Sequence, residues 1–210
     1  MPELHRRTPR PRRKPTNRYH HGDLRHALLQ EAVRTIGADG VEALTLREVG
    51  EHLGVSRTAL YRHFRNKGAL LAAVAREGFQ RFRQDLLTAW TEAGEGRDGL
   101  AAMGVAYVRF ALDNPSHYRV MFGRFRDLCG DDPGLIADGN AAFDVLVAAL
   151  TSILTTESKE PPDVTVLAPF VWATVHGVAM LGIDGQLGPD RATVEALSRF
   201  TVDRLRTMRF

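Results

Sequence analysis

The chain has 210 residues, of which 44% are hydrophobic, 25% are charged and one is a cysteine. This length and composition are typical of a globular protein with a sizeable core, and they exclude collagen-like, globally disordered and multi-span membrane chains. A single cysteine excludes an internal disulfide framework, so we expect a cytoplasmic protein.

The net charge of +3 is unevenly distributed along the chain. Residues 1–67 contain 14 Lys and Arg against 7 Asp and Glu (net +7), and residues 68–210 contain 14 against 18 (net −4). Residues 1–22 are rich in arginine and proline and lack the apolar stretch of a secretory signal. We predict a disordered basic arm there, which either grips phosphates without sequence specificity or is a solvated tail with no role.

Beyond this arm nearly every segment has helical periodicity, and no alternation is long enough for a strand. Asp23 is expected to cap a first helix that ends at Gly40. Thr45 and Glu48 form a capping box, in which hydroxyl and carboxylate would bond the first free amides reciprocally. Gly54 should end this short second helix.

Ser56 is expected to cap a third helix through Tyr61, and Asn66 a long fourth helix that runs to about Trp90. Five further helices are predicted over 98–113, from 115 onward, over 135–154, over 164–183, and from 190 to near the end. The sequence therefore predicts an all-α fold of about nine helices.

The segment Val164–Ile183 is uncharged and long enough to span a bilayer. It contains Pro169 and His176, however, and aspartates rather than Lys or Arg flank it. A helix that is apolar all round is also typical of a core or a subunit interface. We therefore predict a buried helix and no membrane partner.

The most informative stretch runs from Thr45 to Lys67. Two short helices meet at Gly54, and five apolar residues should face inward and lock the pair: Leu46, Val49, Leu53, Val55 and Leu60. This pattern indicates a helix-turn-helix unit. Its second helix would project Arg57, Thr58, Tyr61 and Arg62 outward from the end that enters a major groove.

The stretch Asp23–Leu71 resembles the DNA-binding domain of the TetR family of bacterial transcriptional regulators. The residues that carry the resemblance are Ala32, Gly40, Thr45, Val49, Leu53, Gly54, Val55, Ser56, Leu60, Tyr61, Arg62, His63, Phe64, Lys67, Leu70 and Leu71. The resemblance implies a DNA-binding set made up of Thr45, Arg47, Ser56, Arg57, Thr58, Tyr61, Arg62, His63 and Lys67.

Within this set, Arg57 and Thr58 would read bases, and Lys67 would hold a phosphate beside the free amides of the long helix. The other members would contact the DNA backbone, with Arg47 at a phosphate or a base. Two alternatives remain open: Tyr61 could only be packing, and His63 could be an ordinary surface histidine.

The resemblance also implies that the rest of the chain binds a ligand and forms a homodimer. We therefore divide the chain into the arm (1–22), a DNA-binding domain (23–68) and an effector-binding and dimerisation domain (69–210). The stretch from Trp172 to Gly177 resembles the W-x-x-x-H-G stretch of one TetR subgroup. Trp172 and His176 would lie on one helix face there, as a packed pair or as part of a pocket or interface.

Aromatic and methionine side chains with a few polar tips suit an apolar pocket, although they suit an ordinary helical core equally well. The candidate pocket residues are Tyr107, Phe110, Tyr118, Met121, Phe122, Phe125, Trp172 and His176. The two last helices are the candidate dimer pair, through Val171, Val175, Val178, Leu197, Thr201 and Leu205.

The sequence contains no recognisable catalytic motif and no complete set of metal ligands, so we predict no enzyme, no cofactor and no metal. The predicted partners are double-stranded DNA with a palindromic operator, a small-molecule effector and a second copy of the chain. The favoured function is a repressor that the effector releases from DNA. Two alternatives are an architectural DNA-binding protein without an effector, and a helical enzyme or carrier fused to a DNA reader.

Overall fold

The computed structural model describes residues 21–124, 126–157 and 162–208. Within these ranges it consists of ten α-helices and no strand, which confirms the all-α prediction. The helices are α1 (His21–Ala43), α2 (Leu46–His52), α3 (Arg57–His63), α4 (Lys67–Glu92), α5 (Gly96–Asp113), α6 (Pro115–Phe122), α7 (Arg126–Cys129), α8 (Pro133–Glu157), α9 (Val164–Ile183) and α10 (Arg191–Thr207). The predicted arm lies almost wholly outside the described residues.

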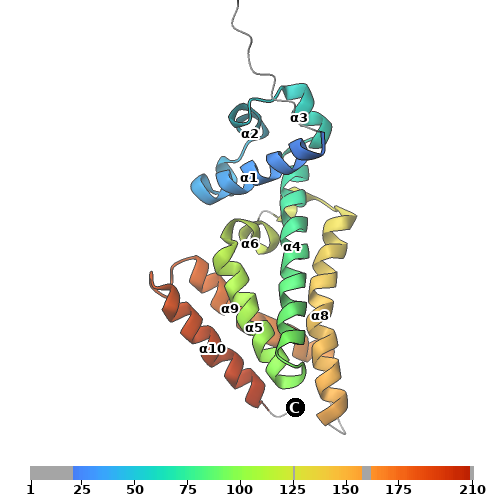
Figure 1. Cartoon of the computed structure of the whole chain (residues 1–210), viewed down its shortest axis with the longest axis vertical. Helices are drawn as coiled ribbons and strands as arrows, with labels where there is room; N and C mark the ends of the chain where they lie inside the picture. Colours follow the sequence, from blue (N-terminus) through green and yellow to red (C-terminus); the bar gives the residue numbers. More distant parts are fainter. Residues whose placement is uncertain (1–20, 125, 158–161, 209–210) are drawn as a thin grey trace, which may run out of the picture.

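The long helix α4 connects two parts of the molecule (Figure 1). Helices α1, α2 and α3 gather around its N-terminal end and form the reader. The body consists of the rest of α4 and helices α5 to α10; α4 packs against α5, α6 and α8, and α5 packs against α9 and α10. Leu70, Leu71 and Val74 of α4 are fully buried, and one continuous core joins the reader to the body.

Side-chain caps begin several helices where the sequence predicts. The side chains of Thr45, Ser56, Asn66 and Asp190 accept hydrogen bonds from backbone amides in the first turns of α2, α3, α4 and α10. These bonds satisfy amides that have no partner inside the helix.

The predicted start of two other helices is wrong. Helix α1 already begins at His21, so Asp23 lies inside its first turn. Helix α5 begins at Gly96 after Glu95, whose side chain makes no capping bond, so Asp98 also lies in a first turn. Acidic residues are favoured in a whole first turn as well as at the cap, and the sequence alone does not separate the two positions.

Glycines account for the tenth helix and for the break near the end of α1. Gly40 has a φ of 85° and interrupts α1 as predicted, but one more helical turn follows it. Gly123 is extended and ends α6, so α7 forms as a separate turn where the sequence suggests one longer helix.

Two helices in the described ranges, α8 and α9, are long and apolar enough to cross a bilayer by length and composition. In the structure α8 packs against α4, and α9 packs against α5 and α10. Leu167, Val171 and Val175 of α9 are buried, whereas Val166 and Phe170 are exposed. The prediction of a buried helix therefore holds for one face of α9, and its other face is exposed.

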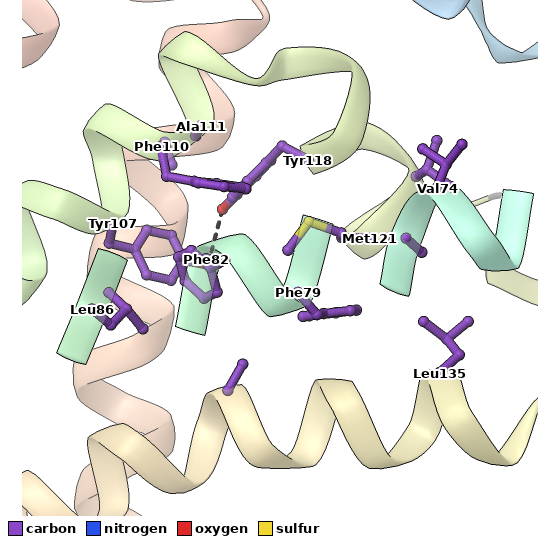
Figure 2. Close-up of a cluster of buried hydrophobic side chains, with 14 of the residues drawn as sticks. Val74, Phe79, Phe82, Leu86, Tyr107, Phe110, Ala111, Tyr118, Met121 and Leu135 are labelled. Atoms are coloured by element: carbon purple, nitrogen blue, oxygen red, sulfur yellow. Dashed lines mark hydrogen bonds between the residues drawn. The ribbon is translucent and has the colours of Figure 1, made fainter. Parts of the chain in front are cut away.

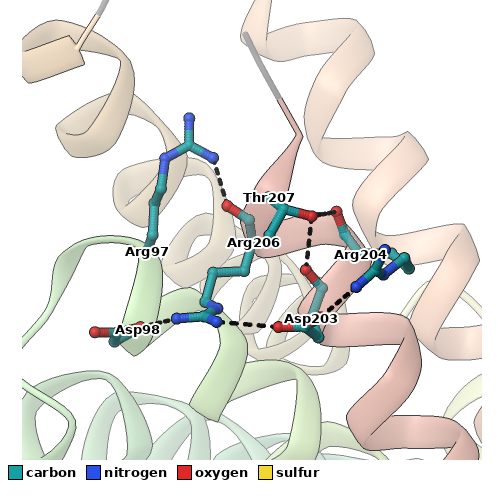
Figure 3. Close-up of polar contacts among 6 residues, drawn as sticks. All are labelled: Arg97, Asp98, Asp203, Arg204, Arg206 and Thr207. Atoms are coloured by element: carbon teal, nitrogen blue, oxygen red, sulfur yellow. Dashed lines mark hydrogen bonds and ion pairs between the residues drawn. The ribbon is translucent and has the colours of Figure 1, made fainter.

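Polar contacts of Arg97 join helix ends at the end of the body that lies far from the reader. Figure 3 shows its bond to Arg206 and the neighbouring ion pairs. Arg97 of α5 donates to the carbonyl oxygens of Arg206 and Met208, each at 2.7 Å, and it pairs with Glu157 of α8 at 2.7 Å. Arg206 in turn pairs with Asp98 at 3.0 Å. These bonds join the ends of α5, α8 and α10 and satisfy carbonyls at the end of α10.

Candidate DNA-binding surface and internal cavity

The start of α2 is held by a variant of the predicted capping box. The Thr45 hydroxyl oxygen accepts from the Glu48 amide at 3.2 Å, as predicted. The same hydroxyl donates to the Glu48 carboxylate at 2.9 Å, whereas the sequence predicts that the Thr45 amide donates to this carboxylate. The hydroxyl is thus held by two bonds to Glu48, and Thr45 is exposed.

The turn between α2 and α3 depends on two glycines. Gly54 has a φ of 64°, a conformation that side chains other than glycine rarely adopt, and the Val55 amide donates to the Gly50 carbonyl at 3.0 Å. A Cβ on Gly50 would lie 2.9 Å from Leu60 Cδ1, so the absence of a side chain lets α3 pack closely on α2. The predicted role of Gly54 is confirmed, and that of Gly50 was missed.

The inward face of the pair is as predicted. Leu46, Val49 and Leu60 are buried, and Leu53 and Val55 are partly buried against them. With these five residues inward, Ser56, Arg57, Thr58, Tyr61 and Arg62 are exposed on the other side of α3. Tyr61 is 52% exposed, so about half of its surface is open to a partner. A hollow between α2 and α3 is lined in part by Arg47, Arg57 and Tyr61.

Other candidate DNA contacts are partly held by the protein itself. Arg47 is exposed and pairs with Glu51 at 2.8 Å. Lys67 is half-buried, and its Nζ donates to the Glu42 carbonyl at 3.0 Å, which leaves two ammonium hydrogens for another acceptor. His63 is half-buried at the end of α3. The nine candidate residues lie on α2 and α3, at the N-caps of these two helices, or at the start of α4.

Sequence reasoning missed three glycines at close helix contacts, two where the reader meets the body and one within the body. A Cβ on Gly37 of α1 would lie 3.0 Å from Ser116 of α6, and one on Gly68 of α4 would collide with the Leu128 carbonyl of α7. A Cβ on Gly78 of α4 would lie 2.5 Å from Met121 Sδ. The absence of a side chain thus lets the Leu128 backbone of α7 approach Gly68, and lets side chains of α6 pack directly on α1 and α4.

Polar contacts cross the same junction. Glu77 of α4 accepts from Gln30 of α1 at 3.4 Å and pairs with Arg81 at 2.6 Å. His117 of α6 is buried, with Nε2 3.6 Å from a Glu77 carboxylate oxygen, and burial lowers the pKa of its imidazole. Near α7, Arg124 pairs with Glu42 at the end of α1. No sequence motif marks these residues, because only the packing of three helices brings them together.

The body contains a cavity of about 440 Å³, a size within the usual range for small-molecule sites. Figure 2 shows part of its wall, where Phe79, Phe82 and Leu86 of α4 face Tyr107 of α5 and Met121 of α6. The lining residues are Phe79, Phe82, Leu86, Leu100, Ala101, Met103, Gly104, Tyr107, Met121, Phe122, Gly139, Asn140, Ala142, Phe143, Leu146, Val171, Trp172, Val175, Val202 and Leu205.

The candidate pocket residues fall into two groups. Tyr107, Met121, Phe122 and Trp172 line the cavity. Phe110, Tyr118 and His176 are not part of the wall: Phe110 packs against Phe82 at 5.1 Å between ring centroids, and the other two contact Tyr107. Phe125 lies outside the described residues. All five α8 residues of the wall were missed, because no pattern in that helix separates them from ordinary core and surface positions.

A hydrogen-bonded network lies behind the wall. Trp172 Nε1 donates to Tyr107 Oη at 3.0 Å, and Tyr118 Oη donates to the same oxygen at 2.9 Å. His176 Nδ1 lies 2.9 Å from Tyr107 Oη and 2.7 Å from Tyr118 Oη. The two hydroxyls and the indole use all their hydrogens inside the network only if Nδ1 accepts, which places the imidazole proton on Nε2.

Burial governs the protonation of this network. It raises the pKa of the Tyr107 and Tyr118 hydroxyls and lowers the pKa of His176. All three groups are therefore neutral at neutral pH. The packed-pair and pocket interpretations of Trp172 and His176 both hold in part, since the indole lines the cavity and the imidazole supports it from behind.

For four of the six candidate dimer residues, the predicted place in the dimer interface is wrong. Val171, Val175 and Leu205 are buried and line the cavity of their own chain, and Val178 is buried as well. A side chain enclosed by its own chain has little surface to offer a partner. Leu197 and Thr201 are half-buried and stay candidates.

Four exposed apolar side chains lie on the other face of the same two helices. Val166 is 69% exposed, Phe170 48%, and Leu181 39% on α9, and Phe200 of α10 is 62% exposed. The space beside Gly177 is open. The sequence pattern could not identify this face, because apolar residues surround α9 on all sides.

In the part of the chain that the structure describes, no group of three or more His, Cys, Asp and Glu side chains is placed to hold a metal ion.

The tetR family of bacterial regulatory proteins matches residues 28–74, and the tetracyclin repressor-like C-terminal domain matches residues 100–205. Residues from the tetracycline repressor protein class C of Escherichia coli are 47% identical over 51 residues, which is 24% of this chain and 23% of that protein.

Two solved structures resemble the whole fold. A protein with unknown function from Rhodococcus sp. RHA1 is 34% identical, has a TM-score of 0.75, and the match covers 90% of this chain and 98% of that chain. The transcriptional regulator FadR from Bacillus subtilis, in complex with stearoyl-CoA, is 18% identical with a TM-score of 0.71, over 87% and 97% of the two chains. With its DNA-binding and C-terminal domains both matched, the chain belongs to the TetR family of bacterial transcriptional regulators.

Proposed function

We propose that this regulator is a homodimeric repressor that binds a palindromic operator and is released when a small molecule enters the cavity. The observation that carries the proposal is the combination of an exposed α3 face with a cavity of about 440 Å³ whose wall includes α4 and α6. An architectural protein without an effector needs no such cavity. We divide the chain as the sequence suggests, into an arm (1–22), a reader (23–68) and an effector and dimer domain (69–210).

The nine candidate side chains would share the DNA contacts. Arg57 and Thr58 are exposed in the first turn of α3, where side chains reach base edges in a major groove. The residues around them would contact the DNA backbone: Tyr61, Arg62, His63, Ser56, Thr45 and Arg47. Lys67 would bind a phosphate with the hydrogens that Glu42 leaves unused.

The dimer would form through the exposed faces of α9 and α10. Val166, Phe170 and Leu181 form a stripe along α9, and Phe200 stands on α10. Two copies that pair through these faces would bury apolar surface that one copy leaves in water. A dimer also explains how a short helix-turn-helix gains specificity, since it can span two half-sites. We assign the chain to the W-x-x-x-H-G subgroup on Trp172, His176 and Gly177, which link this interface to the cavity.

The glycine contacts suggest how the effector would act. Met121 lines the cavity and packs at Gly78, and α7 packs at Gly68, next to Lys67. A molecule that displaces Met121 would shift α6 and α7. Because both helices pack closely against α4, this shift would move α4 as well. The tilt of α4 would then change the separation of the two readers. A coupling of about 1–3 kcal/mol between effector and operator is typical of such systems.

A regulator of this type works where the DNA is, and we therefore place it in the cytoplasm. We assign it no catalytic role, because the hydroxyl hydrogens of Tyr107 and Tyr118 are used in bonds inside the protein.

The test is a salt titration of DNA binding, on a duplex selected from a random library. Arg57→Ala should lose about tenfold or more in preference for one base pair in each half-site. Lys67→Ala should weaken binding to all sequences equally and reduce the salt slope by about one. Arg83→Ala is the control, because Arg83 is exposed on the body. Wild-type binding by both reader variants would contradict the assignment of α3 and Lys67 to DNA.

A further inference from the structure

The wall of the cavity has an unusual lack of charge. Among the described residues that line it there is no Asp, Glu, Lys, Arg or His. Only Tyr107, Trp172 and Asn140 bring polar side-chain atoms to the wall. An ion that enters such a space loses its water without gaining an opposite charge, which is strongly unfavourable.

The polar atoms of the aromatic wall are already occupied. Tyr107 Oη has Trp172 Nε1 at 3.0 Å, Tyr118 Oη at 2.9 Å and His176 Nδ1 at 2.9 Å. Both lone pairs and the hydrogen of this hydroxyl are thus used inside the protein. A carboxylate or phosphate in the cavity would find no spare N–H or O–H donor on this side.

Asn140 on α8 is different, because its side chain is exposed at the edge of the cavity. No hydrogen bond to its amide occurs among the described residues. The amide offers both a donor and an acceptor to a ligand. A single neutral polar group on the ligand would therefore be satisfied at this edge, with the rest of the molecule inside.

The walls also set the shape. Lining residues extend from Phe79 to Leu86 on α4, from Leu100 to Tyr107 on α5 and from Gly139 to Leu146 on α8. Seven residues of helix correspond to about 10 Å along each axis. Aromatic rings form much of the wall, which suits flat apolar groups.

We propose that the effector of this cavity is an uncharged, largely apolar molecule about 10 Å long or more, whose one polar group faces Asn140, and that anions and organic cations are excluded from it. This inference rests on the proposed function only in calling the ligand an effector. The stearoyl-CoA in the Bacillus subtilis FadR structure is a property of that protein.

The test compares three competitors that share one ring system and differ only in the charge of their polar group. N-Phenyl-1-naphthylamine, a neutral dye, reports the cavity by energy transfer from Trp172 in a Trp90→Phe protein, which leaves Trp172 as the one tryptophan. The competitors are 1-naphthalenemethanol (neutral), 1-naphthoate (anionic) and 1-naphthylmethylammonium (cationic). We expect the alcohol to displace the dye at a concentration about tenfold or more below either ion. An ion that competes as well as the alcohol overturns the proposal.

Variants of one wall residue locate the effect. Leu146 is half-buried on α8. Leu146→Lys should improve competition by 1-naphthoate about tenfold or more, and the neutral control Leu146→Gln should not. Leu146→Trp should abolish dye binding by filling the cavity; unchanged binding would place the dye elsewhere and refute the proposal. If these variants do not fold, the three competitors on the otherwise unaltered protein still decide the question.

Asn140→Leu tests the polar end. It should remove the preference for 1-naphthalenemethanol over 1-methylnaphthalene; a preference that persists overturns the role of Asn140.

Operator release is measured separately with the same compounds. A protein that binds no operator contradicts the proposed function and leaves the competition result standing. A charged compound that enters the cavity and releases the operator contradicts only the inference about ligand charge.

Discussion

Two neighbouring tyrosines should differ in what their hydroxyls contribute to stability. In Tyr118→Phe, Trp172 Nε1 still donates to Tyr107, and Tyr107 still donates to His176 Nδ1 at 2.9 Å, so no partner is orphaned. We expect the free energy of unfolding to fall by about 0.5–1.5 kcal/mol, the net value of one hydrogen bond.

Tyr107→Phe should lower the free energy of unfolding by more than Tyr118→Phe does. Tyr118 can still donate to His176 Nδ1 at 2.7 Å, but Trp172 Nε1 loses the one acceptor described for it. An unsatisfied donor costs about 1–3 kcal/mol. The double variant also strips His176 Nδ1 of both partners, so its loss should exceed the sum of the single losses by about 1 kcal/mol.

Urea unfolding at one fixed protein concentration measures these values, because the stability of a dimer depends on concentration. Trp172→Phe is the matched control: it removes the donor that Tyr107→Phe orphans, so it should reduce the additional cost of Tyr107→Phe. If Tyr118→Phe cost more than Tyr107→Phe, or if the two losses simply added, the network deduced from the distances would be wrong.

Three further predictions concern pH, the junction and the interface. Burial lowers the pKa of His176 below its ordinary 6.5, so unfolding takes up a proton in acid. The difference in unfolding free energy between wild type and His176→Gln should therefore shrink as the pH falls below 6.5. A difference that stays constant with pH in urea melts would contradict this. Gly68→Ala should lower the unfolding free energy by about 1–3 kcal/mol, because the Leu128 carbonyl cannot yield, and an unchanged value would disprove that contact. Phe200→Glu should weaken the dimer about tenfold or more in sedimentation, whereas Thr91→Glu, an exposed site on α4, should not; equal effects would argue against the α10 face.

Local chemistry explains why most of the reader could be predicted from the sequence. A capping hydroxyl or amide at Thr45, Ser56 and Asn66 acts on amides within three residues, and Gly54 takes a backbone conformation that its own lack of Cβ permits. The capping box failed only in its second bond, because the Thr45 hydroxyl competes with the amide for the Glu48 carboxylate. Short-range rules therefore fixed the helix-turn-helix unit.

The body depends on contacts between distant segments, which no local rule supplies. Helix α9 is apolar on every face, so its sequence does not reveal that Val171 and Val175 face a cavity while Val166 and Phe170 face solvent. The same applies to Gly68, whose lack of a side chain matters only because α7 packs against it. The pattern named aromatic residues around the cavity correctly in part, but it could not separate its wall from the layer behind it.

Hydroxyl-radical footprinting of a duplex selected from a random library tests most directly whether two copies of α3 read DNA together. We predict two protected half-sites about 34–36 Å apart, roughly one helical turn, in phase on one face of the duplex, and weaker protection of both half-sites in Arg57→Ala at the same protein concentration. A single protected site, or no protection even at low ionic strength, would contradict the account.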